Sequence, residues 1–135
     1  MTTENLLSLE GVHTHIGAYH ILHGVDLAVP RGQLTMLLGR NGAGKTTTLR
    51  TIMGLWRASE GRVRFGERDI GAMRTPEIAG LGIAYVPENM GIFSDLTVKE
   101  NMLLAARSAK NAQQIDDTRL AWIFKLFPAV EKFWN

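Results

Sequence analysis

The residues of this chain best suited to chemistry lie in a glycine-rich run that begins at Gly39. The run Gly39-Arg-Asn-Gly-Ala-Gly-Lys45-Thr46 fits the pattern G-x-x-x-x-G-K-[ST] in full. Because the side chains at its tight turn are small or absent, the backbone N–H groups between Gly42 and Thr47 can curl around a phosphate. A helix predicted to begin near Lys45 adds the positive end of its dipole. The pattern therefore predicts a phosphate-binding loop, in preference to a glycine-rich turn without function.

Each polar side chain at the end of this loop has an expected role. Lys45 would reach the β- and γ-phosphates of a nucleotide, the Thr46 hydroxyl would ligate Mg²⁺, and Thr47 would contact the α-phosphate. The loop alone does not choose among kinases, GTPases and transport ATPases. The residues expected to bind the nucleotide are Gly39, Asn41, Gly42, Ala43, Gly44, Lys45, Thr46 and Thr47.

Such a loop needs a strand before it and a helix after it. Residues 33–38 are largely apolar, as expected of a strand covered on both faces in a parallel sheet. Leu49, Ile52 and Met53 are spaced for one face of a helix over residues 45–53, and Gly54 stands where that helix would stop. The order of strand, loop and helix is the one that a phosphate-binding loop requires.

In the rest of the chain, strand signals come first and helix signals later. Apolar patterning and turn residues predict strands at 6–16, 21–29, 61–65, 68–70 and 83–86. Thr97-Val-Lys-Glu100 is a capping box that opens a helix to about residue 107. A last helix is predicted over about 115–127, with Pro128 interrupting it. This order predicts an α/β fold, a nucleotide-binding core that runs into a helical segment.

Composition narrows the class of protein further. The chain has 135 residues, of which 45% are hydrophobic and 21% charged, so it is long and apolar enough to bury a core. It has no cysteine, which excludes a disulfide scaffold, a thiol catalyst and a cysteine-ligated zinc site. The formal net charge of +2 is slight and its basic residues are scattered, so a nucleic-acid partner is not expected. No apolar run approaches the length of a membrane helix, and a cytoplasmic domain is expected.

The four histidines lie close together in the sequence. His13 and His15 are two residues apart on a predicted strand and therefore share a face, and His20 and His23 follow closely. A metal site would need a carboxylate partner that is not evident nearby, so surface histidines are the preferred interpretation.

Beyond the phosphate loop, the chain resembles the N-terminal half of an ABC-transporter ATPase subunit, most closely the branched-chain amino acid (or urea/amide) importer type. The resemblance extends over residues 6–134 and makes ATP, with Mg²⁺, the expected cofactor. The blocks that carry it are Leu22-His-Gly-Val-Asp-Leu27, Gly39-Arg-Asn-Gly-Ala-Gly-Lys-Thr-Thr47, Leu49-Arg-Thr-Ile-Met-Gly-Leu55, Ser59-Glu-Gly61, Ile83-Ala-Tyr-Val-Pro-Glu88 and Phe93-Ser-Asp-Leu-Thr-Val-Lys-Glu-Asn101.

The resemblance assigns roles to three further residues. Glu88 stands where the family has the glutamine of its Q-loop, which senses the γ-phosphate through Mg²⁺. Glu88 is therefore expected to contact Mg²⁺ and to act as a catalytic residue together with Lys45. The alternative is that Glu88 is a solvated loop residue. The family stacks the adenine on an aromatic residue at the position of Ile16. Either Ile16 makes an apolar contact with the base or Tyr19 stacks on it, unless Tyr19 is simply a surface aromatic.

Other blocks of the family do not occur after Thr46. These are the apolar strand that ends in Asp and Glu, the Ser-Gly-Gly signature and the later histidine. The expected fold is therefore a single, truncated P-loop NTPase domain with an N-terminal antiparallel β portion. Residues 1–95 would form its nucleotide-binding core, and residues 96–135 the start of a helical subdomain. Apolar surface is expected to be uncovered around Trp122, Phe127 and Trp134.

The resemblance implies the ATP-binding component of an importer for branched-chain amino acids or a similar small solute. Its partners would be a second ATPase subunit, integral-membrane permease subunits and, indirectly, a periplasmic binding protein. It would lie at the inner face of the plasma membrane, held there by the permease. Negligible turnover is expected of this chain alone. The alternatives are a non-catalytic nucleotide-binding fragment that associates with an intact ATPase subunit, and a soluble ABC ATPase without a permease.

Overall fold

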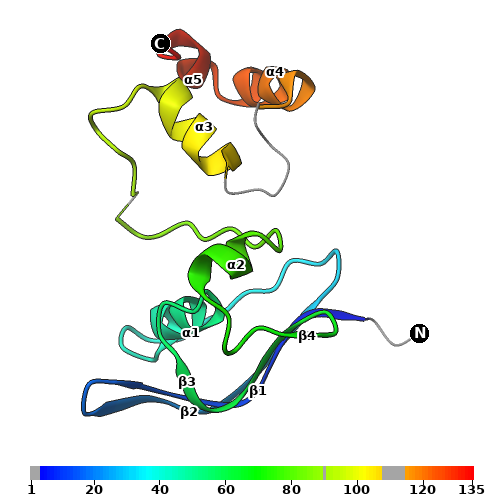
Figure 1. Ribbon diagram of the computed structural model, residues 1–135, viewed down its shortest axis with the longest axis vertical. Helices are drawn as coiled ribbons and strands as arrows, with labels where there is room; N and C mark the ends of the chain where they lie inside the picture. Colours follow the sequence, from blue (N-terminus) through cyan, green and yellow to red (C-terminus); the bar gives the residue numbers. More distant parts are fainter. Residues whose placement is uncertain (1–3, 90, 108–114) are drawn as a thin grey trace. The chain divides into compact units, whose positions relative to one another are not determined.

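An antiparallel sheet of four strands is the base of the first of two units into which the chain divides (Figure 1). The computed structural model describes residues 4–89, 91–107 and 115–135; the units are Met1–Ile78 and Ala79–Asn135, and each is described by itself. The strand order is β2-β1-β3-β4, with every neighbouring pair antiparallel. The bounds are β1 Asn5–Ile16, β2 Tyr19–Pro30, β3 Ala58–Phe65 and β4 Arg68–Asp69. The four predicted strands in this region are confirmed.

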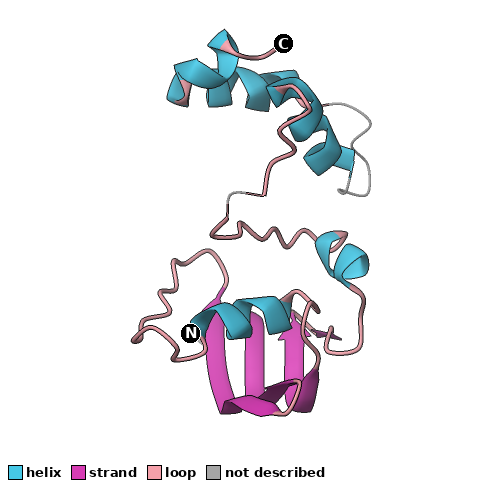
Figure 2. Ribbon diagram, turned by 90° about the vertical axis from the view of Figure 1, so that its left-hand side faces the viewer, coloured by secondary structure: helices cyan, strands magenta, loops and turns pink. Residues whose placement is uncertain are grey.

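One face of the sheet is covered and the other is open, as the alternation along β1 requires. Leu9, Val12 and Thr14 are buried, whereas their neighbours are wholly or partly exposed. The helix α1 (Lys45–Ile52) lies across the covered face in Figure 2. The apolar core comprises Leu9, Val12, Leu22, Ile52, Met53, Val63, Ile70 and Ile78.

A buried pair of hydroxyls joins α1 to the sheet. The Oγ1 atoms of Thr14 and Thr51 lie 3.1 Å apart, and both residues are buried. We expect Thr51→Val to lower the free energy of unfolding by about 1–3 kcal/mol, because it leaves the Thr14 hydroxyl without its partner. The double variant Thr14→Val with Thr51→Val should regain most of this loss in urea denaturation. A double variant less stable than the single one would contradict the pairing.

The helix after the phosphate loop ends as its sequence predicts. Gly54 has a φ of 69°, and the amide of Leu55 donates to the carbonyl of Arg50 at 2.9 Å. Such a left-handed residue closes the last turn of a helix and satisfies one of its free carbonyls. The predicted helix over 45–53 is therefore confirmed.

Two strands predicted to be buried on both faces are not formed in the described structure. Residues 33–38 and 83–86 have no regular secondary structure, and Leu34 and Val86 are 90% and 87% exposed. A central parallel strand needs hydrogen-bonded neighbours, and no other described segment pairs with either run. These two predictions are wrong for this chain. The apolar pattern is that of a strand with a neighbouring strand on each side, and the described residues provide no such neighbours.

Helices make up the regular structure of the second unit. The helix α2 (Thr75–Ala79) stands at the boundary of the two units, and α3 (Val98–Arg107), α4 (Asp117–Leu126) and α5 (Pro128–Lys132) follow. The capping box is confirmed: the amide of Glu100 donates to Thr97 Oγ1 at 3.2 Å, and that of Thr97 to Glu100 Oε2 at 2.8 Å. The hydrogen bond from the Thr97 backbone holds the pKa of Glu100 below its usual value.

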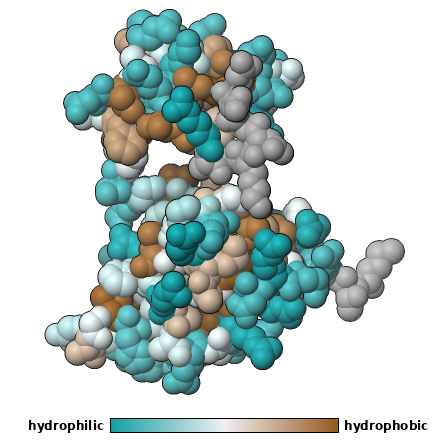
Figure 3. All heavy atoms as spheres, viewed as in Figure 1, coloured by the Kyte–Doolittle hydropathy of each residue, from teal (hydrophilic) through white to brown (hydrophobic). Residues whose placement is uncertain are grey.

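Much of the apolar surface of this unit is uncovered, as expected from the sequence (Figure 3). Trp122 is 60% exposed and Phe127 59%, whereas Trp134 is partly covered by an edge-to-face contact with Phe124 at 5.1 Å. Among the described helices, none is long and apolar enough to cross a membrane.

Candidate nucleotide-binding site

The phosphate loop leads from Gly39 directly into the first turn of α1. Gly44, the residue before the helix, has a φ of 95°, which L side chains rarely adopt. A Cβ atom there would stand 2.8 Å from Leu22 Cδ2 of β2. Gly44 thus lets the loop lie close on the sheet. The contact between Gly44 and Leu22 is not evident from the sequence, although Leu22 opens one of the blocks that carry the family resemblance.

The unpaired amides in the first turn of α1 are suited to binding an anion. Among the described loop and helix residues, Thr48 is the first of α1 whose amide has a backbone acceptor, the carbonyl of Gly44 at 2.8 Å. The amides of Lys45, Thr46 and Thr47 therefore have no carbonyl partner, as is usual at the start of a helix. Free amides and the positive end of the helix dipole together favour a phosphate group.

The Lys45 side chain is folded back over its own loop. Its Nζ donates to the carbonyl of Gly39 at 2.7 Å and to that of Arg40 at 2.9 Å. These two bonds hold the positive charge within the phosphate loop and brace the loop. A bound phosphate would draw the ammonium from one or both carbonyls, because its bonds to a charged oxygen are stronger. The side chains and amides present therefore fit a nucleotide phosphate.

Ile16 and Tyr19 face each other at the end of the β1–β2 hairpin. They are register partners, and Tyr19 is 76% exposed. Ile16 follows Thr14 by two residues, so both it and Tyr19 lie on the side of the sheet that α1 covers. Gly44 lies against Leu22, three residues from Tyr19, so the hairpin end and the phosphate loop share one side of this unit. Which of the two residues contacts adenine stays a prediction.

The two residues predicted to serve Mg²⁺ belong to different units. Thr46 is exposed in the first turn of α1, and Glu88 is exposed in the second unit, so their joint action stays a prediction. Within the described residues, no three His, Asp or Glu side chains are arranged to hold a metal ion. The Thr46 hydroxyl suits a Mg²⁺ ion that is held mainly by nucleotide phosphates and water.

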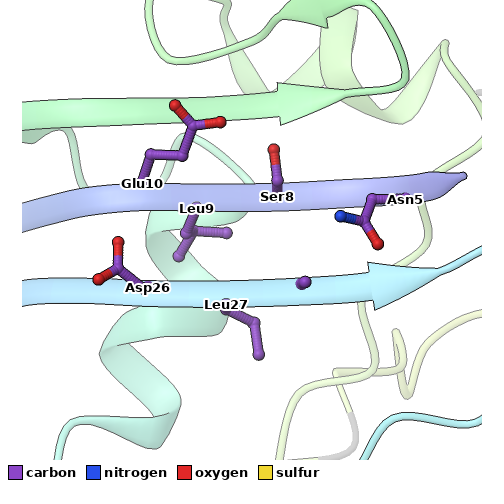
Figure 4. A pocket seen from close by; sticks show the side chains of 7 residues that line it. Asn5, Ser8, Leu9, Glu10, Asp26 and Leu27 are labelled. Atoms are coloured by element: carbon purple, nitrogen blue, oxygen red, sulfur yellow. The ribbon is translucent and has the colours of Figure 1, made fainter. Parts of the chain in front are cut away.

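A hollow elsewhere on the sheet has the wrong charge for a nucleotide. It measures about 350 Å³ and lies on β1 and β2, with Glu10 and Asp26 among the residues that line it (Figure 4). Asp26 Oδ1 accepts a hydrogen bond from the amide of Gly11 at 2.7 Å. Two carboxylates would repel phosphate, so this hollow is not a second nucleotide site.

Comparisons with known proteins agree with this geometry. The family model described as "ABC transporter" matches residues 22–131. The chain is 33% identical over 128 residues to the high-affinity branched-chain amino acid transport ATP-binding protein BraG of Pseudomonas aeruginosa, covering 94% of this chain and 54% of BraG. It is 35% identical over 121 residues to the ribose import ATP-binding protein RbsA 2 of Rhizobium meliloti, covering 89% of this chain and 23% of that protein.

A solved structure described as the ATP-binding subunit of an ABC transporter matches with a TM-score of 0.71 and 28% identity, over 95% of this chain and 50% of that one. The chain thus spans about half the length of BraG and of this structure. It has the ABC ATPase fold, with an N-terminal antiparallel β portion followed by helices. The chain belongs to the ABC transporter family, as the N-terminal portion of an ATP-binding cassette.

Proposed function

We propose that the chain binds Mg-ATP as the ATP-binding part of an ABC importer. The observation that carries the proposal is the pairing of free amides at the start of α1 with the Lys45 ammonium held inside the same loop. Lys45 would bind the β- and γ-phosphates, and the first-turn amides would surround the β-phosphate. Thr46 and Glu88 would hold Mg²⁺, which supplies further positive charge to the phosphates. Ile16 or Tyr19 would contact the adenine.

The solute, the partners and the place of action extend this proposal. Similarity to BraG supports branched-chain amino acids or a similar small solute, whereas similarity to RbsA 2 supports ribose. The partners would be a second ATPase subunit and permease subunits, with a periplasmic binding protein acting through the permease. Glu88 would then relay the state of the nucleotide to the permease at the inner face of the membrane. Recovery of a permease with this chain from native membranes would support this assembly.

Thermal unfolding with different nucleotides tests the phosphate site. Mg-ATP at a hundredfold excess over Kd should stabilise the chain by about 2.7 kcal/mol, because it binds only the folded state. AMP has no β-phosphate for the first-turn amides and should shift the melting temperature far less. Equal shifts with ATP and AMP would contradict a site built around the β-phosphate, and so would a cooperative melt that ATP leaves unchanged.

A second candidate is a nucleotide-binding fragment that associates with an intact ATPase subunit without turning ATP over. The exposure of Leu34, Leu38 and Val86 favours it, since these side chains would be covered by elements packed on the faces of a larger sheet. A phosphate-release assay separates the two. Turnover that disappears in Lys45→Ala supports the ATPase, whereas ATP binding without turnover supports the fragment.

A further inference from the structure

The four histidines gather on the open face of the sheet, at the end of the β1–β2 hairpin. His20 is the centre of the cluster: its ring centroid lies 3.9 Å from that of His23, 4.2 Å from that of His15 and 5.1 Å from that of His13. The rings of His15 and His20 are stacked at 12°. The histidine cluster, as we call these four residues, brings every histidine of the chain together.

A shift in strand register assembles the cluster. His13 pairs with His23 and Thr14 with Leu22, but His15 pairs with His20, so β2 carries an extra residue between them. Without this bulge, His20 and His23 would lie on opposite faces, because they are three residues apart. With it, both face the same side as His13 and His15. Ile16 and Tyr19 lie on the opposite side, at the same end of the hairpin.

The histidine cluster is disfavoured when several of its rings are protonated. His13 Nδ1 and His20 Nε2 lie 3.0 Å apart, a hydrogen bond that needs one N–H and one lone pair. If both rings are charged, both nitrogens carry protons and the bond is lost. Burial by neighbouring atoms, followed by the nearness of His23 and His15, lowers the pKa of His20 below its ordinary value of 6.5.

Neighbouring charged groups offset little of the repulsion among protonated rings of the histidine cluster. On β3, Glu60 pairs with His13 in register and is exposed, and Ser59 Oγ lies 3.1 Å from His15 Nδ1. On β2, Asp26 is occupied by the amide of Gly11. On β1, Glu10 pairs with Arg62 of β3 in register. The unfolded chain therefore binds a proton at His20 more readily than the folded chain does, so folded stability falls as the pH drops below 6.5.

We propose that the histidine cluster makes the end of the β1–β2 hairpin a proton-sensitive element. Protonation of both His13 and His20 breaks the hydrogen bond between them, sets like charges against one another and loosens the pairing that holds Ile16 and Tyr19. The hairpin effect stands on the cluster alone. Its consequence, weaker nucleotide binding at acid pH, rests on the proposed function.

The hairpin effect is tested by the pH dependence of stability in the full chain. The melting temperature should fall between about pH 7.5 and about pH 5.5, and it should fall less in His20→Gln, whose amide cannot be charged. Ser59→Ala is the matched control, because it removes a partner of His15 but no titrating group, and it should keep the wild-type slope. NMR of the histidine rings in the wild type gives a second measurement. Equal slopes in wild type and His20→Gln, or a His20 ring that titrates at or above its ordinary pKa, would overturn the proposal.

The nucleotide effect is tested by measuring the Kd for Mg-ATP at the same two pH values. The increase in Kd at low pH should be at least about three times as large in the wild type as in His20→Gln. Comparing the two proteins cancels the titration of ATP itself. Absence of ATP binding at either pH would refute the proposed function but leave the stability result standing. Equal weakening in both proteins, with unequal stability slopes, would overturn only the coupling of the hairpin to the nucleotide.

Discussion

Replacing Lys45 by alanine should weaken the binding of Mg-ATP by about 10- to 100-fold. The lysine is the cation held inside the phosphate loop, where its Nζ donates to the carbonyls of Gly39 and Arg40. Alanine removes a charge-assisted bond to the phosphates and also the brace that joins the two ends of the loop. Isothermal titration of the purified variant with Mg-ATP measures the change in Kd.

A matched control separates this loss from a general effect of charge. Lys125→Ala makes the same chemical change on the exposed surface of α4, in the second unit. It should leave the Kd unchanged within about twofold, because Lys125 is exposed and does not belong to the phosphate loop that carries the proposed site. Circular dichroism should show that both variants keep the wild-type helix content. If Lys45→Ala binds Mg-ATP as tightly as Lys125→Ala does, the loop is not the nucleotide site.

Features that depend on a few neighbouring residues were predictable from the sequence. The capping box at Thr97 and Glu100 and the stop at Gly54 are local, since the bonding groups lie within a turn of one another. The phosphate loop belongs to the same class, because its glycines and the start of α1 are consecutive in the chain. In each case, the groups that form the feature are near neighbours in the chain, so the residue types and their spacing are enough to predict it.

Features that depend on distant partners were not predictable in this way. The apolar runs at 33–38 and 83–86 have the pattern of central strands, but a strand exists only when a neighbour accepts its hydrogen bonds. The extra residue in β2 that brings His20 beside His15 is likewise a property of the pairing of two strands. The close approach of Gly44 to Leu22 also depends on how two distant segments pack. Periodicity within one segment says nothing of the register that its partner adopts.

Gly61→Ala should lower the free energy of unfolding by about 3–5 kcal/mol, a large part of the total stability of a small domain. Gly61 lies in β3 with a φ of 86°, opposite the point where β1 carries an extra residue between Glu10 and His13. A Cβ atom at this position would overlap the backbone carbonyl groups of Gly11 and Glu10. Those atoms belong to the central strand of the sheet, which pairs on both sides, so they cannot move without breaking the ladder.

Gly66→Ala isolates the overlap from the cost of the unusual backbone angle. Gly66 also has a positive φ, 56°, but a Cβ atom there meets nothing within 4 Å. This variant should lose only the about 1–2 kcal/mol that a left-handed conformation costs an alanine. Urea denaturation of both variants gives the comparison. If Gly61→Ala is no less stable than Gly66→Ala, then β1 and β3 do not approach as closely at Gly11 as this sheet requires.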